Sequence, residues 1–193
     1  LHNNHHTYPN SAKLSVRKWE FDIGWVWIRL FSALGLAKVR RTAPIAHQVE
    51  GKQTLDMDTA MAIVNNRFQI MAQYRKLVIK PLVTQELQRV DDSVRHLFRR
   101  GKRLLSRETS LLQPQQQARL ESLLDHSHSL KVIYEKRLAL QQIWGRTSAN
   151  GQEMVQALRD WCAQAEASGI RALQEFAATL RTYSLQPAPQ MAR

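Results

Sequence analysis

The sequence has almost no cysteine, no long apolar run, and few acidic side chains for its number of basic ones. Cys162 is the only cysteine, so an intrachain disulfide is excluded and nothing indicates an oxidising compartment. No stretch reaches the roughly 18 uninterrupted apolar residues that a transmembrane helix needs. The chain carries 16 Asp and Glu against 28 Lys and Arg, a net charge of +12. We therefore expect an anionic partner such as lipid headgroups, the phosphates of an acyl carrier, or nucleic acid.

The residue composition of the chain changes near residues 47–54, where Pro44 and Gly51 interrupt the spacing of apolar residues. We predict two parts, residues 1–50 and 51–193. The first part carries Trp19, Trp25 and Trp27 and is expected to form short helices and turns. Its apolar stretch 25–36 is too short to span a bilayer and suits an interfacial or buried helix.

The second part shows apolar residues at helical spacing throughout and no strand signals. Helix starts are predicted near Asp56, at Pro114 and at Asn150, and a helix end is predicted at Gly145. Pro81 should bend or break the first of these helices. The fold class is therefore predicted to be all-α, with short helices followed by an antiparallel bundle or a coiled-coil-like extension.

A narrow apolar seam is predicted from about residue 87 to residue 105. Leu87, Val90, Val94 and Leu97 step by three and four residues, as the a and d positions of a coiled coil do. This seam suggests that the extension docks a partner or forms a homo-oligomer.

Three histidines gather at the start of the chain. If residues 1–7 are helical, His2, His5 and His6 lie at i, i+3 and i+4, so their imidazoles project from one side of the helix. Imidazole binds iron, copper, zinc and nickel, so the residue type alone does not select the metal. A solvated terminus or the remnant of a tag is the alternative explanation of such a cluster.

The histidine cluster and the residues after it resemble the membrane fatty-acid desaturases of the delta-9 type. The segments that carry the resemblance are residues 2–12, 19–22 and 34–37, and the later blocks 134–144 and 167–170 also look like the tail of a bacterial branch of that family. The resemblance identifies the chain as the C-terminal part of such an enzyme, from its third histidine box onward. The lack of an initiator Met before Leu1 agrees with that expectation.

The resemblance implies an oxidoreductase that uses O2 and two electrons to introduce a cis double bond into an acyl chain. It implies a di-iron (Fe) centre with His2, His5 and His6 among its ligands, and no further catalytic or cofactor-binding residue. The implied partners are acyl-CoA or a phospholipid acyl chain, an electron-donor redox protein and membrane lipid. The implied location is the bacterial inner membrane, with this segment on the cytoplasmic side. Because the other two histidine boxes are missing, the fragment alone is expected to be inactive.

The densest basic run offers an alternative function. Arg99, Arg100, Lys102, Arg103 and Arg107 suit anionic lipid, but they would also suit nucleic acid. Residues 161–177 resemble the ends of some insertion-sequence transposases. No acidic triad, zinc finger or helix-turn-helix signature supports that function, so nucleic acid is not expected as a partner. A structural coiled-coil adaptor is the other alternative.

Overall fold

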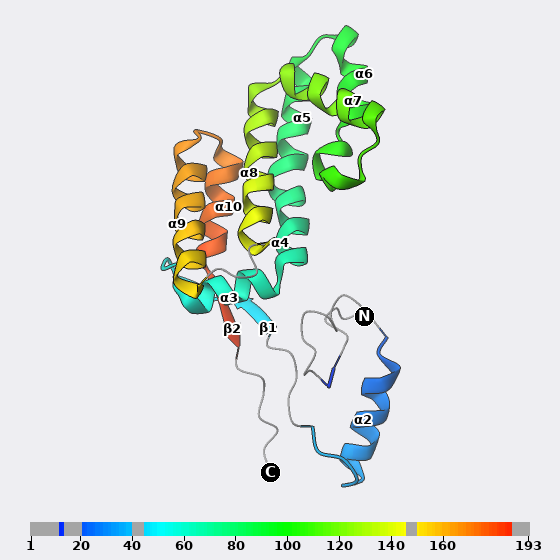
Figure 1. Cartoon of the computed structure of the whole chain (residues 1–193), viewed down its shortest axis with the longest axis vertical. Coiled ribbons are helices and arrows are strands. Elements are labelled where there is room, and N and C mark those ends of the chain that lie inside the picture. The colour runs from blue at the N-terminus through cyan, green and yellow to red at the C-terminus, as the bar shows by residue number, and fades with distance from the viewer. Residues whose placement is uncertain (1–11, 14–20, 40–44, 146–149, 187–193) are drawn as a thin grey trace. The chain divides into compact units, whose positions relative to one another are not determined.

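The computed structural model describes residues 12–13, 21–39, 45–145 and 150–186, without the side chains of Ile45 and Arg100. The described residues are almost wholly helical, so the predicted all-α class is confirmed (Figure 1). None of the helices described has the length and apolar character needed to cross a bilayer. The chain divides into two compact units, residues 1–48 with 184–193, and residues 49–183.

The first unit contains helix α2, Ile23–Ala33, which begins at Asp22. The Asp22 carboxylate accepts a hydrogen bond from the Trp25 amide at 2.9 Å, which satisfies one of the free donors at the helix start. None of the residues of α2 is buried. Strand β1, Ile45–Gln48, pairs with β2, Tyr183–Gln186, although the sequence showed no strand signals. Both strands have four residues, too few for alternation to stand out in a sequence.

The second unit is a helical assembly in which α5, α8, α9 and α10 form the bundle and α3 lies across one end of it (Figure 1). Its elements, in chain order, are α3 (Met57–Asn65), α4 (Arg67–Tyr74), the π-helix η1 (Arg75–Ile79), α5 (Lys80–Arg89), α6 (Asp92–Gly101), the 3-10 turns η2 (Leu104–Ser106) and η3 (Thr109–Leu111), α7 (Pro114–Asp125), α8 (His128–Gly145), α9 (Gly151–Ala167) and α10 (Arg171–Arg181).

The predicted helix starts and ends agree with the structure. Asp56 caps α3, α7 begins at Pro114, α8 ends at Gly145, and Asn150 precedes α9. However, Asn150 makes no side-chain cap hydrogen bond. These positions could be predicted because capping side chains and proline act on the local backbone alone.

Pro81 does not break its helix, because the helix widens from an α turn to a π turn just before it. Residues 75–79 form a π-helix, and the amide of Lys80 donates to the carbonyl of Arg75, five residues earlier. A proline lacks the amide hydrogen and its ring clashes with the carbonyl four residues before it. The wider π turn accommodates the ring, so α4, η1 and α5 continue as one rod.

The predicted seam from residue 87 to residue 105 is interrupted. Val90 is extended, with φ −87° and ψ 146°, and α6 starts two residues later at Asp92. Asp91 and Asp92 favour a helix start over a helix interior, a local signal that the apolar spacing concealed. Leu87 and Val94 therefore lie on different helices, and the basis for a coiled-coil contact is removed.

Two other long helices predicted from periodicity are each split by a short turn. Residues 126–127 separate α7 from α8, and residues 168–170 separate α9 from α10. Gly169 has a φ of +69°, a left-handed conformation that favours glycine. The apolar spacing continues through each turn because both flanking helices bury a face in the same core.

The core of the second unit centres on three aromatic rings from different helices. Tyr74 is 0% exposed and lies edge-on to Phe176 at 5.0 Å and to Trp161 at 6.5 Å between ring centroids. Its hydroxyl donates to the carbonyl of Ile133 at 2.6 Å, and burial raises the pKa of that hydroxyl. Tyr74 thus joins the end of α4 to α8, α9 and α10. Cys162 is also buried, and burial raises the pKa of its thiol to about 12, so the thiolate is scarce at neutral pH.

Replacing Tyr74 tests this arrangement. Tyr74→Phe removes one buried hydrogen bond and should lower the free energy of unfolding by about 1 kcal/mol. Tyr74→Leu also removes the edge-on ring contacts and should cost about 2 kcal/mol more. Urea denaturation followed by circular dichroism measures both values. Equal stability of the wild type and both variants would show that Tyr74 does not join the helices.

Candidate nucleic-acid interface

A groove of about 390 Å³ lies where η1 and α5 face the segment that follows α6. One wall comes from α4, η1 and α5, and the other from residues 102–106. Basic side chains line both walls: Arg75, Lys76, Lys80, Lys102 and Arg103. All five are exposed to solvent, so their charged ends are available to a ligand.

The charge of this groove is not balanced by nearby acids. No Asp or Glu lines it, and none of its five basic side chains takes part in an ion pair within the described part of the chain. The acid on α5, Glu86, is engaged elsewhere, with Arg89 at 3.9 Å and with the Ser127 hydroxyl at 2.8 Å. Such a concentration of one sign of charge raises the local concentration of anions.

Four of the lining residues are aliphatic, and together they are called the floor of the groove. Ile79, Val83 and Leu87 line it at four-residue spacing, and Ala72 lines it from α4. Ile79 and Val83 are buried, at 4% and 5% exposed, while Leu87 is half-buried. The groove therefore combines an apolar base with a basic rim, a combination that suits an amphipathic anion.

Helix α8 fixes both walls of the groove through two hydrogen bonds one helical turn apart. The Ile133 carbonyl accepts the Tyr74 hydroxyl, next to the first wall. Arg137 donates from Nη2 to the carbonyl of Ser106 at 3.2 Å, in the second wall. Helix α8 therefore sets the distance between the two walls.

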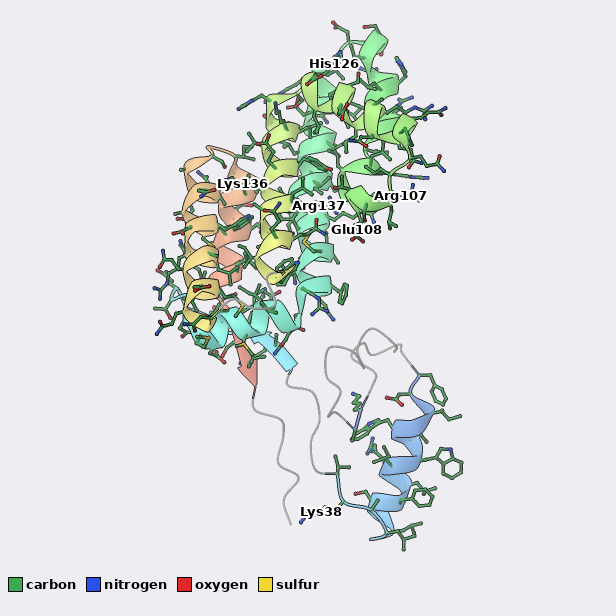
Figure 2. The ribbon with its side chains drawn as sticks, in the orientation of Figure 1. Lys38, Arg107, Glu108, His126, Lys136 and Arg137 are labelled. Atoms are coloured by element: carbon green, nitrogen blue, oxygen red, sulfur yellow. The ribbon has the colours of Figure 1, made fainter. Side chains whose placement is uncertain are left out.

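Arg137 places a further positive charge next to the second wall, because it donates to the Ser106 carbonyl there; Figure 2 labels it on α8, near Glu108. It is 3% exposed, and its Nη1 has no hydrogen-bond partner among the described residues. Burial lowers the pKa of this guanidinium, while Tyr134, Tyr74 and Glu108 act in the opposite direction. An arginine remains charged nevertheless, so Arg137 adds to the positive potential of the region.

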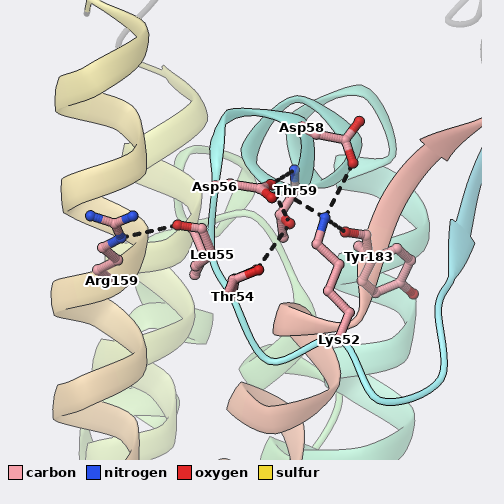
Figure 3. Close-up of polar contacts among 8 residues, drawn as sticks. All are labelled: Lys52, Thr54, Leu55, Asp56, Asp58, Thr59, Arg159 and Tyr183. Carbon is pink, nitrogen blue, oxygen red and sulfur yellow. Dashed lines mark hydrogen bonds and ion pairs between the residues drawn. The ribbon is translucent and has the colours of Figure 1, made fainter.

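A separate polar cluster joins the start of α3 to Tyr183, the first residue of β2 (Figure 3). The Lys52 ammonium lies 3.3 Å from Asp56, 3.2 Å from Asp58 and 3.3 Å from the Tyr183 carbonyl. The Thr59 amide donates to the Asp56 carboxylate at 2.8 Å, and this hydrogen bond is the main cause that lowers the pKa of Asp56. Because Lys52 holds both acids and the Tyr183 carbonyl together, the cluster has a structural role.

The comparisons with known proteins identify the family. A sequence model of a transposase family, the ISL3 type of DDE transposases, matches residues 56–186. The transposase for insertion sequence element IS1001 of Bordetella parapertussis is 34% identical over 123 residues, 63% of this chain and 30% of that protein. The chain belongs to this transposase family.

Shorter matches connect the chain to lipid desaturases. The sn-2 palmitoyl-lipid 9-desaturase of Nostoc sp. (strain 36) is 51% identical over 43 residues, 22% of this chain and 15% of that enzyme. The sn-1 stearoyl-lipid 9-desaturase of Synechocystis sp. is 46% identical over 43 residues, 22% and 14%. The chain spans less than a third of the length of these curated relatives and of the transposase. No solved structure matches the chain.

The identification as a desaturase is therefore wrong, and so are the inferences that rested on it. The desaturase matches cover about a fifth of the chain, whereas the transposase family accounts for residues 56–186. The same finding contradicts the predicted acyl-chain oxidoreductase, the di-iron (Fe) cofactor, the partners acyl-CoA, phospholipid and redox protein, and the place in the inner membrane. The blocks 134–144 and 167–170, assigned to a desaturase tail, lie inside the transposase match.

A DDE transposase implies divalent metal held by acidic side chains. Within the described residues, no three side chains of His, Cys, Asp or Glu come together as a metal site would require. The pair Asp56 and Asp58 is held by Lys52 instead. The residues described do not fit such a metal, and the predicted ligands His2, His5 and His6 lie outside them.

Sequence reasoning found only one wall of the groove. The predicted basic run contributes Lys102 and Arg103, whereas Arg107 donates to the side chain of Gln116. Arg75, Lys76 and Lys80 were missed because isolated basic residues on a helix are usually solvated. Lys76 and Lys80 are four residues apart, a spacing that places both on one helix face and was the available signal.

Arg137 can be tested through local protection from hydrogen exchange. Arg137→Met removes the donor to the Ser106 carbonyl, so amides in residues 102–107 should exchange about tenfold faster, as the loss of a charged hydrogen bond predicts. Amides of α9 and α10 serve as the internal control and should keep their rates. Mass spectrometry of deuterium uptake measures both, and unchanged uptake in residues 102–107 would contradict the assignment.

Asp56 should make stability depend on pH below neutrality. Its pKa is lowered below the ordinary 3.8 in the folded protein, so its contribution is present above about pH 4 and is lost as the pH falls through the folded value. Asp56→Ala should lower the free energy of unfolding by about 1 kcal/mol at pH 7, and by less at pH 3. Asp56→Asn keeps the helix cap without the charge and is the matched control. A difference between wild type and Asp56→Ala that is the same at both pH values would exclude this role.

Proposed function

We propose that residues 49–183 bind the phosphate backbone of DNA through the basic groove, as a helical part of a transposase. The observation that carries the proposal is the set of five exposed basic side chains on both walls with no acid among the lining residues. Membership of the transposase family supports DNA as the anion. The earlier expectation that nucleic acid is not a partner is wrong on the same ground.

The chemistry of the groove suits backbone contacts more than the reading of bases. Lysine and arginine bind phosphate oxygens without regard to sequence, and these contacts fix the position of a protein on DNA. Each neutralised phosphate releases counterions, so affinity should fall steeply with salt. The net charge of +12 strengthens the attraction over longer distances. The groove therefore serves to hold and orient DNA.

Removal of single lysines tests the proposal. Lys76→Ala and Lys80→Ala should each weaken binding to a duplex and reduce the slope of log affinity against log salt by about 0.9. Lys131→Ala is the matched control, because Lys131 is exposed on α8 and does not line the groove. Fluorescence anisotropy with a labelled duplex at several NaCl concentrations provides both quantities.

The control separates groove binding from general attraction. If Lys131→Ala lowers the slope as much as Lys76→Ala does, DNA binds by diffuse charge and the groove has no special part. If the full chain shows no salt-dependent binding to any duplex, the proposed function is wrong.

A further inference from the structure

We infer that the groove holds an unpaired nucleotide of DNA, with the base on the aliphatic floor and the flanking phosphates on the basic rim. This inference rests on the proposed function and specifies its ligand. Contacts to the backbone of a closed duplex need only cations, because the phosphates lie outside the stacked bases. An aliphatic floor adds nothing to such contacts, but it favours the face of an unstacked base.

The order of the lining residues along the helix supports this arrangement. Ile79, Val83 and Leu87 form one row at four-residue spacing, and Lys76, Lys80 and Thr84 form a second row at the same spacing. Both rows line the groove, so an apolar strip and a polar strip run side by side over roughly 12 Å of the rod. A base on the first strip would place its own phosphate beside the second.

The opposite wall supplies charge to the other side of the ligand. Lys102 and Arg103 line that wall, and the carbonyl of Ser106 is held there by Arg137. A single phosphate needs one cluster of cations, whereas a nucleotide within a chain has a phosphate on each side. Basic groups on both walls fit the second case. The volume of about 390 Å³ lies in the range of roughly 300–1,000 Å³ typical of pockets for small organic ligands.

The experiment compares three DNA hairpins with the full chain. One has a blunt end, one carries a three-nucleotide single-stranded overhang, and one carries an overhang of the same length without bases. The base-containing overhang should bind about tenfold more tightly than the other two, as burial of one base face on an apolar surface predicts. Anisotropy at a fixed NaCl concentration gives the three Kd values, and poly-glutamate is added as a competitor to test an acidic peptide as the occupant.

Filling the groove supplies the matched variants. Ala72→Phe places a ring over the floor from an exposed position and should reduce the tenfold preference to about one. Ala178→Phe, exposed on α10 and absent from the groove, should retain the preference. Thr84→Phe fills the groove from α5 and replaces Ala72→Phe if that variant melts at a lower temperature.

Each result is decisive. A preference that follows the base and is lost on filling the groove supports the inference. Equal affinity for blunt, abasic and base-containing hairpins overturns it and leaves backbone binding in place. Displacement of the overhang hairpin by poly-glutamate at equal charge also overturns it, in favour of an acidic peptide. Absence of binding to all three hairpins shows instead that the proposed function has failed.

Discussion

The geometry of the second unit depends on two hydrogen bonds made by residues of α8 that lie one helical turn apart. In one, a carbonyl of α8 accepts; in the other, a side chain of α8 donates. The Tyr74 hydroxyl binds the Ile133 carbonyl at 2.6 Å, and Arg137 binds the Ser106 carbonyl at 3.2 Å. Each bond anchors one wall of the basic groove. The first is buried and the second is partly buried, and an unmade hydrogen bond in such a place is costly. These contacts complete the core and also set the width of the basic groove on the surface.

The basic side chains of the groove have no acidic residue among the lining residues to balance their positive charge. Lys76 and Lys80 line one wall and Lys102 and Arg103 line the other, and Ile79 is part of the floor. Like charges this close together repel one another, and a bound anion would relieve that repulsion. The π-helix before Pro81 contributes to this arrangement, because it keeps α4 and α5 in one rod and so brings residues 72–87 to a single surface.

Local signals were sufficient for the helical class and for helix ends such as Asp56, Pro114 and Gly145. They were not sufficient for features that depend on distant contacts. The apolar spacing continues across the break at Val90, so it could not reveal that break. The cations of η1 form a site only because residues 102–106 lie beside them. The desaturase resemblance gave too much weight to a short segment of the chain. Residues 161–177, which resembled the ends of transposases, include Trp161 and Phe176, two core rings whose centroids are 6.0 Å apart.

The central claim is that DNA occupies the groove between η1–α5 and residues 102–106. Lysine acetylation followed by mass spectrometry, with and without a DNA duplex, tests it at the level of single residues. The account predicts that DNA slows acetylation of Lys76, Lys80 and Lys102, while Lys131 on α8 reacts at an unchanged rate. Protection of Lys131 to the same degree, or no protection of the three groove lysines under conditions where DNA is bound, would contradict it.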